Sequence, residues 1–188
     1  MNHFRFEETL IEGLKIVYPF VAEDERGYYM KFFEHNIFEQ NGIFLSSHEE
    51  AQSFSYKGVI RGLHFQTVHP QSKLVRVISG AAYDVAVDLR EGSPTFGKWY
   101  GTTLSSKNQK MFYIPEGFAH GLMALTNEMI LSYMSGDDYS PESDGGIRWD
   151  DPELGIQWPL EMVERVIVSK KDQNLPLFRE FCLSTGIV

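Results

Sequence analysis

Cysteine is nearly absent from this chain of 188 residues, in which Cys182 is the one thiol. A single cysteine cannot form an internal disulfide, so the fold must be held by other interactions. Cys182 also lies far from every motif that contains histidine or aspartate. This position indicates an inert thiol rather than a catalytic nucleophile.

Long apolar runs are absent as well. No stretch approaches the roughly 20 apolar residues that cross a bilayer. Residues 1–8 also lack the apolar core of a signal peptide. We therefore expect a cytoplasmic protein with no membrane partner.

Basic residues are also few. The chain has 17 Lys and Arg but 26 Asp and Glu, which gives a formal net charge of -9. Binding to nucleic acid or to anionic membranes depends on clustered Lys and Arg that displace counterions. The charge balance argues against both partners. An anionic ligand must instead be held by a local basic site.

Apolar residues are plentiful, at 43% of the chain, and they occur in short runs punctuated by Gly and Pro. The length and composition predict one domain over residues 1–188. Within residues 82–89, Val85 and Val87 fall on one face of a strand, and Asp84 and Ala86 fall on the other. Such alternation predicts a mostly β fold.

Other segments with this pattern extend the prediction. Strands are expected at 28–33, 61–66, 73–78, 98–104, 110–114, 122–125 and 129–134, and short helices at 37–41 and near the carboxyl end. Many short strands separated by regular turns are typical of a sandwich or a jelly roll with a central cavity.

Three ionisable residues, His64, Lys73 and His120, interrupt these apolar strands. Buried ionisable groups are unfavourable unless they are paired or used, so this set predicts a lined cavity rather than a filled core. Alternation places His64 on one face of its strand and Arg61 on the other, although the long Arg61 side chain could still reach the mouth of the cavity.

The segment 115–120 has the spacing Pro-x-Gly-x-x-His, which resembles the second motif of cupins, a jelly-roll superfamily. Metal-binding cupins supply a His-x-His triplet upstream, because a metal ion needs three or four converging ligands. Here the triplet is His64-Phe65-Gln66. We expect no metal site and no cofactor, and a metal-free acid/base role for His64.

Seven ordered motifs across nearly the whole chain resemble the dTDP-4-dehydrorhamnose 3,5-epimerase family. They are RGLHFQ (61–66), KLVRV (73–77), DVAVDLR (84–90), SPTFGKW (93–99), IPEGFAHG (114–121), SPES (140–143) and IRWDDPELGIQWP (147–159). The resemblance implies a cupin-like double-stranded β-helix with a few short helices. It also implies inversion of C3 and C5 in dTDP-4-dehydro-6-deoxy-D-glucose, toward dTDP-L-rhamnose.

The same resemblance implies catalytic roles. His64 matches the family's general base, and Asp172 matches the carboxylate that orients its imidazole. Lys73 would stabilise the enolate electrostatically, with His120 as a second donor or a positioning group. Tyr133 matches the tyrosine that faces the base and returns the proton.

Substrate contacts are implied for a second set: Arg26, Tyr29, Lys31, Glu49, Ala51, Arg61, His120, Tyr139, Asp144 and Lys171. Arginine suits a diphosphate and aromatic rings suit a nucleobase. In the family the segment around Arg26 reaches the neighbouring subunit's site. This implies a homodimer to which the N-terminal strand segment contributes. At the other end of the chain, a helical extension is expected.

Three residues depart from the usual family pattern. Lys31 replaces a glutamate, and Glu49 and Ala51 stand where a glutamine and an asparagine are usual. Charges and amides that contact the nucleotide or sugar are therefore changed. This leads to the hypothesis that the protein uses a related nucleotide sugar or inverts one centre only.

Three further alternatives stay open at the level of sequence. A 3,4-ketoisomerase would shift the carbonyl, although paired proton carriers such as His64 and Tyr133 suit inversion better. A metal-dependent cupin oxygenase would require bound iron or zinc. A non-catalytic sugar-nucleotide binder would leave the carbons beside the ketone unexchanged with solvent.

Overall fold

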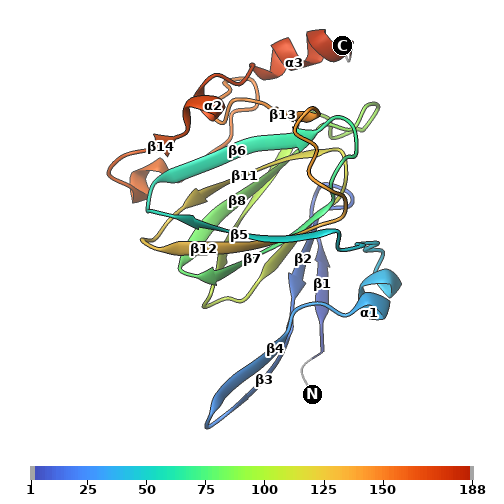
Figure 1. Cartoon of the computed structure of the whole chain (residues 1–188), viewed down its shortest axis with the longest axis vertical. Helices are drawn as coiled ribbons and strands as arrows, with labels where there is room; N and C mark the ends of the chain where they lie inside the picture. Colours follow the sequence, from blue (N-terminus) through green and yellow to red (C-terminus); the bar gives the residue numbers. More distant parts are fainter. Residues whose placement is uncertain (1–2, 187–188) are drawn as a thin grey trace.

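Two β-sheets face each other in a jelly roll (Figure 1), as the alternating pattern predicts. The computed structural model describes residues 3–186. One sheet has the order β1 (Arg5–Glu8), β2 (Lys15–Tyr18), β10 (Met111–Ile114), β7 (Lys73–Ser79), β12 (Met129–Ser135) and β5 (Glu49–Ser55). The other has the order β13 (Asp144–Gly146), β6 (Val59–Gln66), β11 (Phe118–Ala124), β8 (Ala81–Asp88) and β9 (Trp99–Ser105), with β14 (Ile167–Val168) paired to β6.

The inner faces of the two sheets form the central core. Strand β8 shows how alternation builds it, because Ala82 and Ala86 pack between the sheets while Val85 and Val87 pack on the outer side. On β7 the inward residues are Lys73, Val75 and Val77. Apolar residues fill one end of this space, and ionisable ones line the other end.

The outer faces of the sheets are covered by different parts of the chain. Helix α1 (His35–Gln40) buries Phe38 against the β2, β10 and β7 side, where the ring makes edge contacts with Phe4 and Phe6. The C-terminal segment covers the second sheet. It contains the 3-10 helix η1 (Leu160–Met162), α2 (Lys170–Gln173) and α3 (Phe178–Thr185), of which α3 packs Phe178 and Phe181 on that sheet.

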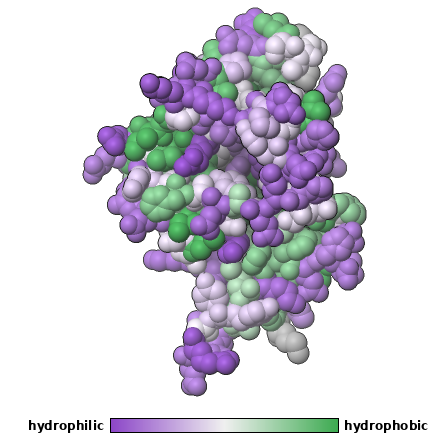
Figure 2. Space-filling model, in the orientation of Figure 1, coloured by the Kyte–Doolittle hydropathy of each residue, from purple (hydrophilic) through white to green (hydrophobic). Residues whose placement is uncertain are grey.

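A separate hairpin of β3 (Phe20–Asp24) and β4 (Gly27–Lys31) extends away from the two sheets (Figure 1). Its strands pair only with each other among the described residues. The outermost end of the hairpin is hydrophilic, as Figure 2 shows at the lower end of the molecule. Tyr28 and Tyr29 are 58% and 61% exposed there, so the hairpin presents aromatic side chains that this chain does not cover.

Strand β6 departs from simple alternation at Gly62. The pairing of β6 with β11 shifts register between His120 and Leu122, so that Arg61 and His64 line the same cavity. Alternation alone placed them on opposite faces, and that prediction is wrong.

The described residues contain no helix that is both long enough and apolar enough to cross a membrane.

Candidate active site

A cavity of about 560 Å³ opens between the two sheets. Its lining comes from both walls and from the C-terminal segment: Ser53, Val59, Ile60, Arg61, His64, Lys73, His120, Leu122, Tyr133, Ile167, Val168, Ser169 and Asp172. All four residues expected to carry the chemistry, His64, Lys73, Tyr133 and Asp172, therefore meet in one space.

His64 is held by Asp172, which lies 108 residues further along the chain. Asp172 Oδ1 lies 2.9 Å from His64 Nε2, and Asp172 Oδ2 accepts the Gly62 N–H at 3.1 Å. The Ser169 hydroxyl caps α2 by accepting the Asp172 N–H at 3.0 Å. This local cap and the pairing of β14 with β6 hold the carboxylate next to the imidazole Nε2.

Asp172 is ionised in this setting. Burial alone would raise the pKa of its carboxyl, but the hydrogen bonds from His64 and Gly62 outweigh burial and lower the pKa. An ionised carboxylate only accepts hydrogen bonds, so we assign the imidazole proton to Nε2. Nδ1 then keeps its lone pair, which is what a general base requires.

Tyr133 stands on β12, in the sheet opposite His64. Its hydroxyl lies 2.9 Å from Ser53 Oγ on the edge strand β5. Burial raises the pKa of the Tyr133 phenol, and the hydrogen bond with Ser53 offsets part of that effect. The phenol therefore stays protonated near neutral pH and is equipped to donate a proton.

Lys73 enters the cavity from β7, on the same wall as Tyr133. Burial lowers the pKa of its ammonium, while the carboxylates of Asp144 and Asp84 act in the opposite direction. An ammonium deprived of water is attracted strongly to new negative charge that forms beside it.

His120 forms a second histidine–aspartate pair, with Nε2 at 2.8 Å from Asp84 Oδ1. Both side chains are buried, and the His120 ring lies across from the Tyr133 ring with centroids 6.3 Å apart. Sequence reasoning placed Asp84 on the face of Ala86 and gave it no role. Since that face is the cavity face, the alternation of β8 was the signal that could have identified Asp84.

A smaller hollow of about 270 Å³ adjoins the cavity and shares His64 and Lys73 with it. Asp144 lies at its centre, where it accepts the Tyr139 hydroxyl at 3.0 Å and forms an ion pair with Lys171. Glu49 Oε1 accepts the Tyr139 N–H at 3.1 Å. These four residues, all expected to contact substrate, thus form one polar group near His64.

Two more of the expected binding residues lie near the cavity. Arg61 donates from Nε to Ser55 Oγ at 3.0 Å, which directs the side chain along the cavity wall. Ala51 pairs with Tyr133 across β5 and β12, so its short side chain is on the cavity side of the sheet.

The structure does not bring Arg26, Tyr29 and Lys31 to the cavity of their own chain. They lie on the β3–β4 hairpin, where Arg26 pairs with Asp24, and Lys31 pairs with Glu34 at 2.8 Å. Ser53 was absent from the expected set, although it contacts the Tyr133 hydroxyl. The signal that could have identified Ser53 was its place in Ser53-Phe54-Ser55, which matches a Ser-x-Ser of the family pattern.

Inversion of a carbon centre by proton transfer calls for a base on one side of the substrate and an acid on the other. The fold and the candidate proton carriers on the two walls of the cavity are those of a cupin-type jelly-roll enzyme. Residues 8–180 match the family model of dTDP-4-dehydrorhamnose 3,5-epimerase. The chain belongs to this family of isomerases.

Individual relatives support this assignment. The chain is 52% identical over 180 residues to a dTDP-4-dehydrorhamnose 3,5-epimerase of Methanothermobacter thermautotrophicus, covering 96% of this chain and 97% of that one. A Legionella pneumophila dTDP-6-deoxy-D-glucose-3,5-epimerase, solved with dTDP-4-keto-L-rhamnose, has a TM-score of 0.91 at 43% identity, with 94% of each chain covered. A dTDP-4-dehydrorhamnose 3-epimerase of Streptomyces niveus is 38% identical and covers 90% of this chain and 82% of its own length.

Proposed function

We propose that this protein inverts C3 and C5 of dTDP-4-dehydro-6-deoxy-D-glucose to give dTDP-4-dehydro-L-rhamnose. The observation that carries the proposal is the position of the His64–Asp172 pair and Tyr133 on facing walls of one cavity. Family membership and the Legionella relative bound to dTDP-4-keto-L-rhamnose support the choice of substrate.

In the proposed first step, His64 Nδ1 removes the proton from the carbon beside the C4 ketone. The bonding electrons move onto the ketone oxygen and produce an enolate, while Asp172 stabilises the imidazolium. Lys73 supplies positive charge to the enolate oxygen, and His120 acts as a second donor or positions the sugar. This set explains why a lysine is kept in a space where burial disfavours its charge.

Tyr133 completes the inversion in this mechanism. Its hydroxyl gives a proton to the opposite face of the carbon as the enolate electrons return to form the C–H bond. The resulting phenolate and the imidazolium then exchange protons with solvent before the second centre reacts. Burial of Tyr133 supports this role, because it keeps the phenol protonated until a stronger base, the enolate carbon, is present.

The β3–β4 hairpin supports a homodimer in which each chain completes its partner's site. It extends from the sheets and exposes Tyr29, and Arg26 lies at its turn. We propose that Arg26 contacts the diphosphate, and that Tyr29 and Lys31 line the nucleotide pocket, of the partner subunit. The nucleotide would also meet Glu49, Ala51 and Tyr139. Cytoplasmic location stays a prediction from the sequence.

Proton NMR in heavy water tests the proposed function. Incubation with dTDP-4-keto-6-deoxyglucose is expected to introduce deuterium at both C3 and C5, because each inversion takes its new proton from solvent. Exchange at neither carbon would refute the epimerase proposal for this substrate. The same experiment with GDP- and CDP-linked 4-keto sugars establishes which nucleotide is preferred.

Replacing Tyr133 with Phe should separate the two halves of the reaction. Proton removal by His64 continues, so the protein should still exchange the sugar's proton with deuterium while the rate of completed inversion falls further. NMR reports both rates in one sample. Equal loss of exchange and inversion would make Tyr133 a positioning residue.

A single-centre epimerase is the second candidate. Lys31, Glu49 and Ala51 change groups expected to hold the nucleotide or sugar, and the Streptomyces niveus relative is a 3-epimerase. Deuterium at C3 alone, with C5 unexchanged, would establish this alternative.

A further inference from the structure

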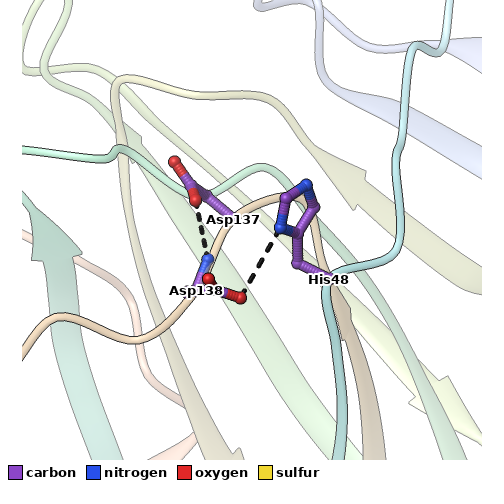
Figure 3. Close-up of side chains that lie close together, drawn as sticks. All are labelled: His48, Asp137 and Asp138. Atoms are coloured by element: carbon purple, nitrogen blue, oxygen red, sulfur yellow. Dashed lines mark hydrogen bonds and ion pairs between the residues drawn. The ribbon is translucent and has the colours of Figure 1, made fainter.

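A group of histidine and aspartate side chains lies outside the cavity, on the loops that border it. Figure 3 shows His48, Asp137 and Asp138, each of which offers one ligand atom, and these three atoms lie within 4.8 Å of one another. His48 Nδ1 is 3.5 Å from Asp138 Oδ1. A second imidazole is adjacent, since His69 Nδ1 is 3.3 Å from Asp137 Oδ2.

In the described part of the chain, neither carboxylate of this group is neutralised by a strongly basic side chain. Within residues 3–186, neither Asp137 nor Asp138 forms an ion pair with Lys or Arg, and their ionic partners are the two imidazoles. The Asp138 backbone N–H donates to Asp137 Oδ1 at 2.8 Å, which holds the Asp137 carboxylate against the main chain of Asp138. With neutral imidazoles the group carries two negative charges, and a divalent cation would neutralise them.

One pair of ligand atoms, on His48 and Asp138, has the spacing of a transition-metal site. Bonds of about 2.0 to 2.2 Å to imidazole nitrogen and carboxylate oxygen place the ligand atoms of a tetrahedral ion about 3.3 to 3.6 Å apart. The observed 3.5 Å between His48 Nδ1 and Asp138 Oδ1 falls in that range. An imidazole among the ligands favours ions such as Zn²⁺ over Ca²⁺ and Mg²⁺, which prefer oxygen alone.

We propose that His48, Asp137 and Asp138 bind a divalent transition-metal ion of the Zn²⁺ type, with water completing the coordination. His69 supports the site through its ion pair with the Asp137 carboxylate, since a neighbouring group commonly orients a ligating side chain. This site is separate from the cavity of His64 and from the interior position where metal-binding cupins hold their ion.

The site joins two segments that carry residues proposed to contact substrate, and it adjoins the loop between β6 and β7. His48 directly precedes Glu49 on β5, Asp138 directly precedes Tyr139, and His69 belongs to the loop between β6 and β7. Gln71 Nε2 already links that loop to the Asp137 carbonyl at 2.8 Å. A bound ion would fasten these segments together and hold the Tyr139 ring beside Asp144, without taking part in proton transfer.

Zinc calorimetry on the full chain tests the proposal. After removal of metal with a chelator, the protein should bind one Zn²⁺ per chain, and Zn²⁺ should raise its unfolding temperature. His48→Gln and Asp138→Asn should each weaken binding by about tenfold or more. His35→Gln is the matched control, because His35 is exposed and paired with Glu39 on α1, at another part of the surface.

Three outcomes would overturn the proposal. One is the absence of stoichiometric binding by the wild-type protein. Another is equal weakening by His35→Gln and His48→Gln, which would indicate nonspecific binding to surface histidines. The third is binding that persists in the His48→Gln, Asp138→Asn double variant but is lost in His64→Asn, which would place the ion in the cavity. Circular dichroism of each variant confirms that the fold is retained.

Discussion

Replacing His64 with alanine should reduce turnover of the dTDP-linked 4-keto sugar by about 10² to 10⁴-fold, the usual effect of removing a general base. The variant loses the lone pair that takes the carbon-bound proton and also the imidazolium that faces the enolate. Deuterium exchange at C3 and C5 should fall with turnover, because no later step proceeds without proton removal. Initial rates by NMR measure both quantities.

The matched control for this variant is His35→Ala, which removes an exposed histidine from α1. It should leave the rate unchanged. Because His64 accounts for one of the hydrogen bonds to the buried Asp172, the unfolding temperature of His64→Ala must be recorded as well. A folded His64→Ala variant with nearly normal turnover would show that another group is the base.

Replacing Gly62 with alanine should destabilise the fold strongly. Gly62 has a φ of +123°, and a Cβ built there would lie 2.6 Å from Gly121 Cα and 2.8 Å from the His120 carbonyl oxygen. Both neighbours are backbone atoms of β11, so neither moves aside as a side chain would. Backbone strain contributes about 1 to 3 kcal/mol, and forced close packing contributes about 1 to 3 kcal/mol more.

Gly92→Ala separates these two causes. Gly92 also has a positive φ, of +74°, but a Cβ there would meet nothing within 4 Å. Its replacement should cost about 1 to 2 kcal/mol through conformation alone. Urea unfolding followed by circular dichroism compares the two variants. If Gly92→Ala is as destabilising as Gly62→Ala, crowding against β11 is not the cause.

The central strands could be predicted from the sequence because their apolar side chains pack into the two large core clusters. Strand β8 follows its predicted faces residue by residue. Strand β5 was not predicted, since an edge strand with the sequence EEAQSFS is largely exposed and has no apolar alternation. The hydrogen bonds that pair it with β12 have no local signature in the sequence.

The site could be predicted only in part, because some of its residues also lack a distinctive local sequence pattern. His64, Lys73 and His120 interrupt apolar strands, so their sequence context marked them. Asp172 follows two lysines in a polar segment, and only resemblance to a family selected it. The position of Arg61 depended on the register shift at Gly62, which arises from close backbone packing with β11 rather than from the pattern of β6 itself.

His64 and Asp172 are in contact but lie 108 residues apart in the sequence. This separation affects the order in which the parts of the site form. During synthesis, the strands that form the cavity walls all emerge before β14 and α2, which bring the carboxylate to β6. In the proposed mechanism, an incomplete chain therefore holds the base without its orienting partner. Catalytic competence is then acquired last, when the C-terminal segment docks, and a shortened chain is expected to bind sugar nucleotides without converting them efficiently.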